Sequence, residues 1–213
     1  MSVRSLNVFG HEVIAALHKK LRMVVRPVAR DMVARFDEPK GPEDIAAGYP
    51  MVDDKYGDYH SAAVFCPFGV PGTRLRCREA YFIQGTHGQH RSDGLRWGSW
   101  SGLPTMVSPD GKLIAYYKEG FDRSSPMWRS PATMPSWASR ITLVNETVGV
   151  CRLGDLTEDD VLACGVADPS LGTRGMSPMT VFRDKWNARY AAKGLGYDKS
   201  PWVWKVAVKG VEQ

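Results

Sequence analysis

Apolar residues near the start of the chain recur at intervals of three or four positions: Ile14, Leu17, Leu21, Val24 and Val28. Basic residues follow a similar spacing on another face: Lys19, Arg22, Arg26 and Arg30. Two such faces are typical of an amphipathic helix. Pro27 lacks a backbone donor and interrupts the pattern. The spacing therefore predicts a helix over residues 11–26, within a basic, mainly helical N-terminal part that covers residues 1–36.

A period of two replaces the helical spacing after the turn at Pro71-Gly72. Three arginines alternate there with apolar residues: Arg74, Arg76 and Arg78. Side chains two positions apart share one face of a strand, so the alternation predicts a strand with three cations on one side. Asp110-Gly111 predicts a hairpin turn before a strand over residues 113–117. Asn145-Glu146 predicts a turn between strands at 140–143 and 147–153.

The last third of the chain predicts two helices and a closing strand. Thr157 precedes three acidic residues and suits a helix cap, with Gly165 as the stop. Ser177-Pro178 opens a second helix that ends at Gly194. Four apolar residues alternate in the final strand, over residues 201–209: Trp202, Trp204, Val206 and Val208. Strands outnumber helices in this pattern, which favours an α+β fold built as a small mixed β-barrel with packed helices.

Two long polar stretches, at about residues 37–62 and 84–132, interrupt the pattern. Both are rich in turn-forming residues and lack a sustained period, so we interpret them as loop insertions. The chain has 213 residues, more than a typical single domain and fewer than two. We therefore predict one domain over residues 1–213, with the barrel core at residues 64–209.

Composition excludes several classes of protein. Hydrophobic residues make up 43% and charged residues 24%, which is ordinary for a folded domain and argues against disorder as the main state. No apolar run approaches the roughly 20 residues that span a bilayer, and the N-terminus lacks the apolar core of a signal peptide. We therefore expect a cytoplasmic protein that does not contact membranes. The four cysteines form no CxxC pair, so reduced thiols are expected.

The formal net charge of +5 is concentrated at the N-terminus. Residues 1–35 hold seven basic and two acidic residues, whereas the rest of the chain is balanced. A basic segment of this kind suits a polyanionic partner. The alternative is a solvated helix face that pairs with the acidic stretch at residues 37–58.

Three loop tryptophans have arginines near them in the sequence: Trp97, Trp100 and Trp128. Such side chains can stack on unpaired bases, although they can also pack against the barrel. His87-x-x-His90 has a possible metal spacing, but no flanking cysteine or carboxylate completes a zinc site. We therefore predict no metal and no cofactor. Asp159-Asp160 is interpreted as helix-capping acids rather than as a catalytic pair.

Several segments together resemble the ASCH-domain proteins of phages and prophages. Residues 71–79, PGTRLRCRE, resemble the family's PGDRLWVRE strand, and residues 134–141, MPSWASRI, resemble MPRWASRI. Residues 156–166, LTEDDVLACGV, are similar to ISEEDALAEGI. The pair Phe182-x-x-x-Trp186 and the run Pro201-Trp202-Val203-Trp204 match the family's F-x-x-x-W helix and NPWVW strand. These segments follow the family's order from about residue 64 to residue 209.

The resemblance implies a PUA-like β-barrel of a superfamily whose members mostly bind RNA or modified bases. It includes amidohydrolases that use a lysine and a threonine of a GRKTxT turn and a glutamate from the helix after the central strands. A ribonuclease activity has been ascribed to other members. Here the corresponding stretch, AALHKKLRMVVRP at residues 15–27, has no threonine, and Lys20 stands for the lysine. The family's glutamate aligns with Cys164. Amide hydrolysis needs an activated nucleophile and a proton shuttle, so the hydrolase site is expected to be degenerate.

We therefore expect a phage-type nucleic-acid-binding protein that takes RNA, another single strand or a modified base in the host cytoplasm. The expected phosphate contacts are basic residues of the N-terminal part and the arginine strand: Lys19, Lys20, Arg22, Arg26, Arg74, Arg76 and Arg78. The loop tryptophans are expected to stack on bases. One alternative is an active amidohydrolase or ribonuclease that uses Lys20, Cys164 and Glu79. Another is a module that binds a phage or host protein through the insertions.

Overall fold

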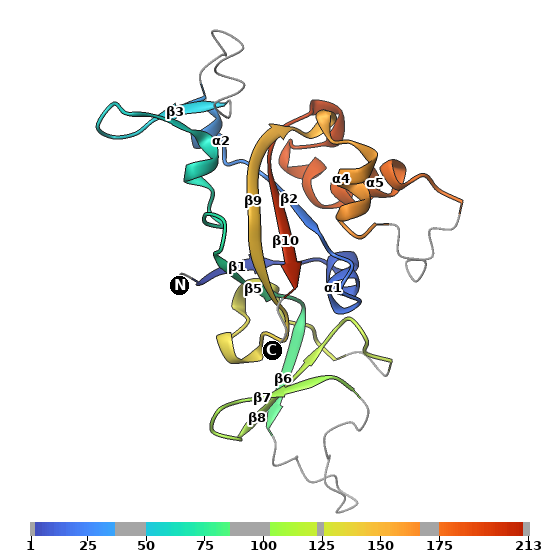
Figure 1. The fold of residues 1–213 in the computed structure, drawn as a ribbon. Helices are drawn as coiled ribbons and strands as arrows, with labels where there is room; N and C mark the ends of the chain where they lie inside the picture. The colour runs from blue at the N-terminus through green and yellow to red at the C-terminus, as the bar shows by residue number, and fades with distance from the viewer. Residues whose placement is uncertain (1–2, 37–49, 86–102, 123–125, 167–174, 211–213) are drawn as a thin grey trace, which may run out of the picture.

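The computed structural model describes residues 3–36, 50–85, 103–122, 126–166 and 175–210 (Figure 1). Its centre is a five-stranded sheet with the strand order β1-β5-β9-β10-β2. The bounds of these strands are Val3–Asn7 for β1, Met23–Pro27 for β2, Arg74–Arg78 for β5, Thr142–Arg152 for β9 and Trp202–Gly210 for β10. β1 pairs with β5 in parallel, and the other three pairs are antiparallel. The predicted α+β class is confirmed.

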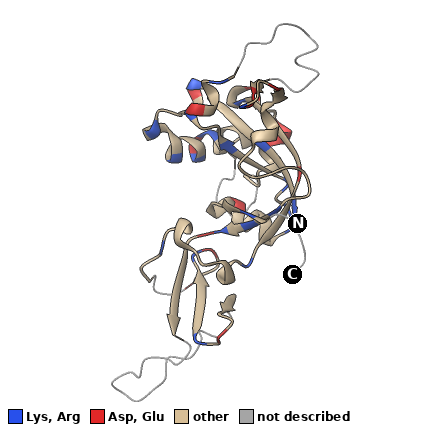
Figure 2. Cartoon of the chain, turned by 90° about the vertical axis from the view of Figure 1, so that its left-hand side faces the viewer, with Lys and Arg blue, Asp and Glu red and all other residues tan. Residues whose placement is uncertain are grey.

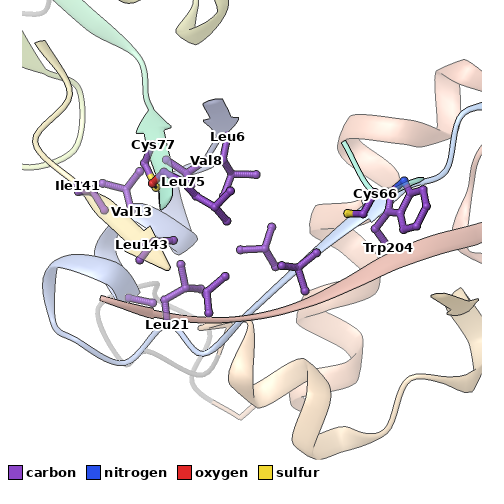
Figure 3. Packing of buried hydrophobic residues seen from close by; sticks show 14 of the residues in the cluster. Leu6, Val8, Val13, Leu21, Cys66, Leu75, Cys77, Ile141, Leu143 and Trp204 are labelled. Carbon is purple, nitrogen blue, oxygen red and sulfur yellow. The ribbon is translucent and has the colours of Figure 1, made fainter. Parts of the chain in front are cut away.

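The sheet is not closed into a barrel by backbone hydrogen bonds. β1 and β2 are its two edges, and no strand pairing joins them in the described chain. A helix, α1 (Gly10–Leu17), follows β1 and packs on the sheet instead, with Val13 and Ala15 in the same buried cluster as residues of all five strands. Figure 3 shows Leu6, Val13, Leu75 and Leu143 meeting in this first core. The predicted barrel is thus corrected to an open, curled sheet whose core is covered by α1.

The predicted helix over residues 11–26 is wrong in its second half. α1 ends at Leu17, Lys19 adopts a φ of +57°, and the chain enters strand β2 at Met23. Val24 packs into the first core, while Met23 and Val25 pack into a second core on the other face of the sheet. A strand buried on both faces reads as an unbroken apolar run, which periodicity cannot separate from a helix.

The second core lies between the sheet and two helices, α4 (Glu158–Ala163) and α5 (Pro178–Tyr190). Both helices lie on one side of β2 and β10 (Figure 1). The Thr157 hydroxyl accepts the backbone N–H of Asp160, and Gly165 adopts a φ of +79° after the helix. The Ser177 hydroxyl caps α5 in the same way. The predicted starts of both helices and the stop of the first at Gly165 are confirmed. α5 itself ends at Tyr190, and a 3-10 helix, Ala191–Lys193, continues the chain to the predicted stop at Gly194.

β9 is one strand of 11 residues, not two strands around a turn. Asn145 lies inside it, fully buried, and its side-chain amide donates to the carbonyl oxygen of Gly69 at 3.0 Å. Its backbone also pairs with Gly72 and Thr73. Asn145 therefore holds the loop before β5 against β9. Because asparagine is also common in turns, the sequence alone does not distinguish this buried role from a turn.

The predicted insertions contain regular structure. A three-stranded sheet, β6-β8-β7, is formed by Tyr81–Gly85, Leu113–Tyr117 and Thr105–Val107, and it confirms the strand predicted at residues 113–117. Its strands carry no charged residue (Figure 2). A hairpin of β3 (Met51–Asp53) and β4 (Tyr59–Ser61) lies in the first insertion.

The remaining elements are short, namely α2 (Arg30–Val33) and the 3-10 helices Ala62–Phe65, Pro131–Thr133, Ser136–Ala138, Leu153–Asp155, Ala191–Lys193 and Tyr197–Lys199. In the parts of the chain that the structure describes, no helix has the length and apolar character needed to cross a bilayer. All four cysteines are free thiols. Cys66 and Cys77 lie in the first core, as expected of core thiols.

Candidate nucleic-acid interface

The turn between α1 and β2 presents three of the predicted basic residues. Lys19, Lys20 and Arg22 are exposed there. The backbone N–H of Lys20 donates to the carbonyl of Ala15 at 2.7 Å, and that of Arg22 donates to the carbonyl of Ala163 at 2.9 Å. The carbonyl of Arg22 accepts a further bond from β10. The turn is therefore held to α1, to the end of α4 and to the central sheet, so its cations project from a fixed backbone.

A cavity of about 300 Å³ lies beside this turn. We call it the turn cavity, and its lining is Ala16, Leu17, Lys19, Arg22, Arg140, Ile141, Thr142, Leu143 and Gly210. All three of its ionisable side chains are cationic. Apolar side chains from α1 and from β9 with its preceding residues supply the rest of the wall. The cavity therefore combines an apolar surface with positive charge.

Arg140 is fixed in the wall of the turn cavity. Its Nε and one Nη donate to the two carboxylate oxygens of Glu79, each at 2.8 Å, and the same Nη donates to the carbonyl of Glu119 at 3.1 Å. The guanidinium also lies 4.1 Å from the ring centroid of Tyr117. Burial raises the pKa of Glu79, and the bonds from Arg140 oppose that rise. Glu79 is thus an ion-pair partner rather than an available general base.

The three residues of the hydrolase alternative do not form a catalytic group. Cys164 is 1% exposed and belongs to the second core. Burial raises the pKa of its thiol above the ordinary value, and the charge of Glu12 adds to the rise. A cysteine nucleophile reacts as the thiolate, which this environment disfavours. Lys20 lies on the exposed turn and Glu79 is bound to Arg140.

Arg26 is not a surface residue, which corrects its predicted role as a phosphate contact. It is 7% exposed, and its two Nη atoms donate to the two carboxylate oxygens of Glu12, each at 2.7 Å. Further bonds run to the carbonyls of Val25 and Asn7, at 2.8 and 2.6 Å. Burial acts to lower the pKa of Arg26, but the charge and hydrogen bonds of Glu12 raise it above the ordinary value. The pair bridges β1, α1 and β2, and in the described ranges β1 and β2 do not pair as strands.

The strand β5 displays its three arginines as predicted. Leu75 and Cys77 point into the core, while Arg74 is exposed and Arg76 and Arg78 are half-buried. One Nη of Arg78 donates to the carbonyl of Ala132 at 3.2 Å. The arginines do not belong to the lining of the turn cavity. They form a separate basic row on the outer face of the sheet.

Of the three tryptophans predicted to stack on bases, the structure describes Trp128. Trp97, Trp100 and the pair His87 and His90 lie outside the described residues. Trp128 is half-buried, and its ring meets the ring of Phe121 edge-on at 5.1 Å between centroids. This is the packing alternative for Trp128, because a ring already in contact presents less surface to a base.

Sequence reasoning missed a groove of about 550 Å³ between α1 and α5. We call it the helix groove, and its lining is Phe9, His11, Lys185, Ala188, Arg189 and Lys193. Its three long cations recur every four residues on α5 and its extension, a spacing that was present in the sequence. Phe182 and Trp186 of the same helix indicate packing against the core, and the basic row on its other side was not recognised.

The β3–β4 hairpin brings ligand atoms of Asp54, Asp58 and His60 within 4.8 Å of one another. The Asp54 carboxylate accepts the backbone N–H groups of Tyr56 and Asp58 and contacts His60 at 3.3 Å. The bond from Tyr56, together with those from Asp58 and His60, lowers the pKa of Asp54. These contacts account for the cluster as a turn, so it carries no metal assignment.

The pH dependence of folding is expected to report on His11. Burial, together with Lys185, Arg26 and Arg189, lowers its pKa to about 4, although Glu12 acts in the opposite direction. The unfolded chain therefore takes up a proton near pH 6.5 that the folded chain resists, so stability falls from about pH 6.5 to pH 4 by about 1.4 kcal/mol per pH unit. Urea unfolding at pH 7 and pH 5 measures this loss.

The matched variant for that measurement is His11→Gln, which keeps a polar side chain but cannot take up the proton. It is expected to lose less stability than the parent between pH 7 and pH 5. An equal loss in both proteins would assign the effect to other groups.

Comparisons with protein-family models, with curated proteins and with solved structures find no match for this chain, so the assignment of its site rests on the geometry described above.

Proposed function

We propose that this protein binds nucleic acid, RNA or a modified base, and that it holds one nucleotide in the turn cavity. The observation that carries the proposal is the lining of that cavity, which joins three cations to an apolar wall in about 300 Å³. Small-molecule sites begin at about this volume and combine apolar walls with a few polar groups. A nucleotide matches the apolar wall through the flat faces of its base, and it matches the cations through its anionic phosphate.

The position of each side chain suggests how the nucleotide is held. Leu17 is exposed and offers surface for the face of a base, while Lys19 and Arg22 on the turn offer charge for a phosphate. Arg140 is oriented by Glu79 and presents a planar guanidinium. Single-stranded nucleic acid is commonly recognised by this combination of stacking surface and phosphate contact.

The resemblance to the ASCH family supports the same location. Arg140 and Ile141, which line the cavity, belong to the family-like segment at residues 134–141. Lys19 and Arg22 lie in the stretch that corresponds to the family's GRKTxT turn. The proposal is therefore an ASCH-like, phage-type binding protein with its site at that turn, on a sheet that is open in the described chain. Binding is favoured over hydrolysis because Cys164 is buried and Glu79 is neutralised by Arg140.

The double variant Lys19→Ala/Arg22→Ala is expected to weaken binding of single-stranded RNA about tenfold, or about 1.4 kcal/mol. Loss of two phosphate contacts is expected to reduce the slope of log affinity against log salt by about 1.4 for a single strand. Fluorescence anisotropy with labelled oligouridylate at several salt concentrations measures both quantities.

The matched control is Lys112→Ala/Lys118→Ala, which also removes two exposed cations, at the ends of β8, neither of which lines the cavity. It is expected to leave affinity and salt slope nearly unchanged. If the two double variants weaken binding equally, the turn cavity is not the site.

A further inference from the structure

The helix groove lies at the opposite end of α1 from the turn cavity. Phe9 and His11, around the start of α1, line the groove, whereas Ala16, Leu17 and Lys19, around its end, line the cavity. α1 has eight residues, so the two sites are separated by about 12 Å along the helix axis. One helix therefore connects two concave basic surfaces.

Three cations of the helix groove form a single row. Lys185, Arg189 and Lys193 follow one another at four-residue intervals, which places them on one side of α5 and its extension over about 12 Å. Like charges at this spacing destabilise a helix slightly. The row therefore does not serve the stability of α5.

The charge of this row is not neutralised within the described chain. Among the residues that the structure describes, no carboxylate lies within 4.0 Å of His11, Lys185, Arg189 or Lys193. Glu12 is adjacent in sequence to His11, but both of its oxygens are taken by Arg26. The groove thus contrasts with Arg26, the buried cation beside it, whose charge is paired with Glu12.

Arg189 is an exposed cation of the groove that lies close to a second cation, Arg26. Its guanidinium lies 3.1 Å from the ring centroid of Phe9, a ring that Arg26 also approaches, at 4.2 Å. Burial lowers the pKa of Arg189, and the positive charge of Arg26 lowers it further, against the opposing effects of Tyr190 and Glu12. An anion in the groove would offset the repulsion between Arg189 and Arg26 and would favour the charged form of Arg189.

One side of α1 offers a path between the two sites. Its residues at helical spacing are His11 and Ile14, which are half-buried, followed by Leu17 and His18, which are exposed. None of them is acidic, and the one acidic residue of α1, Glu12, is buried in its pair with Arg26. A nucleic-acid strand along α1 would therefore meet apolar and imidazole surface, with cations at each end.

We propose that the helix groove binds the phosphodiester backbone of the strand whose nucleotide sits in the turn cavity, an inference that rests on the proposed function. His11, Lys185, Arg189 and Lys193 contact consecutive phosphates, and α1 sets the distance between the two sites. The protein then recognises a strand of several nucleotides rather than a free nucleotide.

The test compares uridine monophosphate with an oligouridylate of about ten nucleotides, a length within the site size of single-strand binders. Lys185→Ala/Lys193→Ala is expected to leave binding of the monophosphate unchanged. The same variant is expected to weaken binding of the oligouridylate about tenfold and to reduce its salt slope by about 1.4, as two lost phosphate contacts require. Lys112→Ala/Lys118→Ala is the control and is expected to change neither.

The outcomes separate the two proposals. If the groove variant binds the oligouridylate like the parent while Lys19→Ala/Arg22→Ala loses both ligands, the groove inference is wrong and the proposed function stands. If only the groove variant loses the oligouridylate, the groove stands and the turn cavity is wrong. If the parent binds neither ligand, both proposals fail. Equal binding of oligoglutamate, lost in the same variant, would overturn the assignment to phosphodiesters.

A second readout does not depend on a variant. Burial lowers the pKa of His11 most, Glu12 opposes that change, and Lys185, Arg26 and Arg189 lower the pKa further. A phosphodiester beside His11 adds negative charge to this site. The oligouridylate is therefore expected to raise the pKa of His11 from about 4, as followed by the NMR shifts of its imidazole. The monophosphate is expected to leave it in place. No change with the oligouridylate would contradict occupation of the groove.

Discussion

Replacement of Glu12 by alanine is expected to lower the free energy of unfolding by about 3–5 kcal/mol, the usual result when one member of a buried ion pair is removed. Arg26 is 7% exposed and would keep its charge inside the protein without a carboxylate. The backbone N–H of Phe9, which now donates to Glu12 at 3.0 Å, would also lose its acceptor. Urea unfolding at pH 7 measures the change.

Two further variants identify the cause of that loss. Glu146→Ala removes the carboxylate of an exposed pair, Glu146–Lys209 at 3.2 Å, and is expected to cost less than about 1 kcal/mol. The double variant Glu12→Leu/Arg26→Met removes both buried charges and is expected to recover much of the stability lost in Glu12→Ala. If Glu12→Ala costs no more than Glu146→Ala, the buried pair does not stabilise the fold.

The buried pair also explains how an open sheet keeps its shape. β1 and β2 do not pair as strands in the described chain, yet Arg26 of β2 donates to Asn7 at the end of β1 and to Glu12 of α1. One guanidinium thus joins the two edges through side-chain bonds. In Glu12→Ala, amide hydrogen exchange is therefore expected to accelerate first in β1 and β2.

Local rules predicted the elements whose boundaries depend on neighbouring residues. Thr157 and Ser177 cap their helices, and Gly111 supplies the positive φ of the turn before β8, because each acts within a few residues of itself. Asn145 did not follow its local rule, since its partner Gly69 is 76 residues away in the sequence. Its burial in β9 was decided by tertiary contacts.

The same distinction separates the parts of the candidate site. Lys19 and Arg22 were predicted as phosphate contacts, and they do line a cavity, because a turn exposes whatever cations it carries. The helical spacing predicts Arg26 on the same face as Lys19 and Arg22. Residues 23–27 form strand β2 instead, and Arg26 is buried. The helix groove joins the start of α1 to α5, an association of segments that no local pattern encodes.

Glu79→Gln is expected to separate stability from binding. The amide keeps the shape of the side chain but no longer neutralises Arg140, whose guanidinium now makes two 2.8 Å bonds to the carboxylate. The free energy of unfolding is expected to fall by about 3 kcal/mol, since the remaining charge is largely buried. Urea unfolding and RNA anisotropy, on the same preparation at a temperature where the variant is folded, measure both effects.

Affinity is expected to change in the opposite direction. Arg140 lines the turn cavity, so removal of the Glu79 charge raises the positive potential there and strengthens the attraction of a phosphate by on the order of 1 kcal/mol. RNA is therefore expected to bind about fivefold more tightly to a less stable protein. A variant that only loosened the fold would lose affinity together with stability. Weaker binding by Glu79→Gln would mean that the Glu79–Arg140 pair shapes the cavity rather than limiting its charge, and that the nucleotide does not contact Arg140.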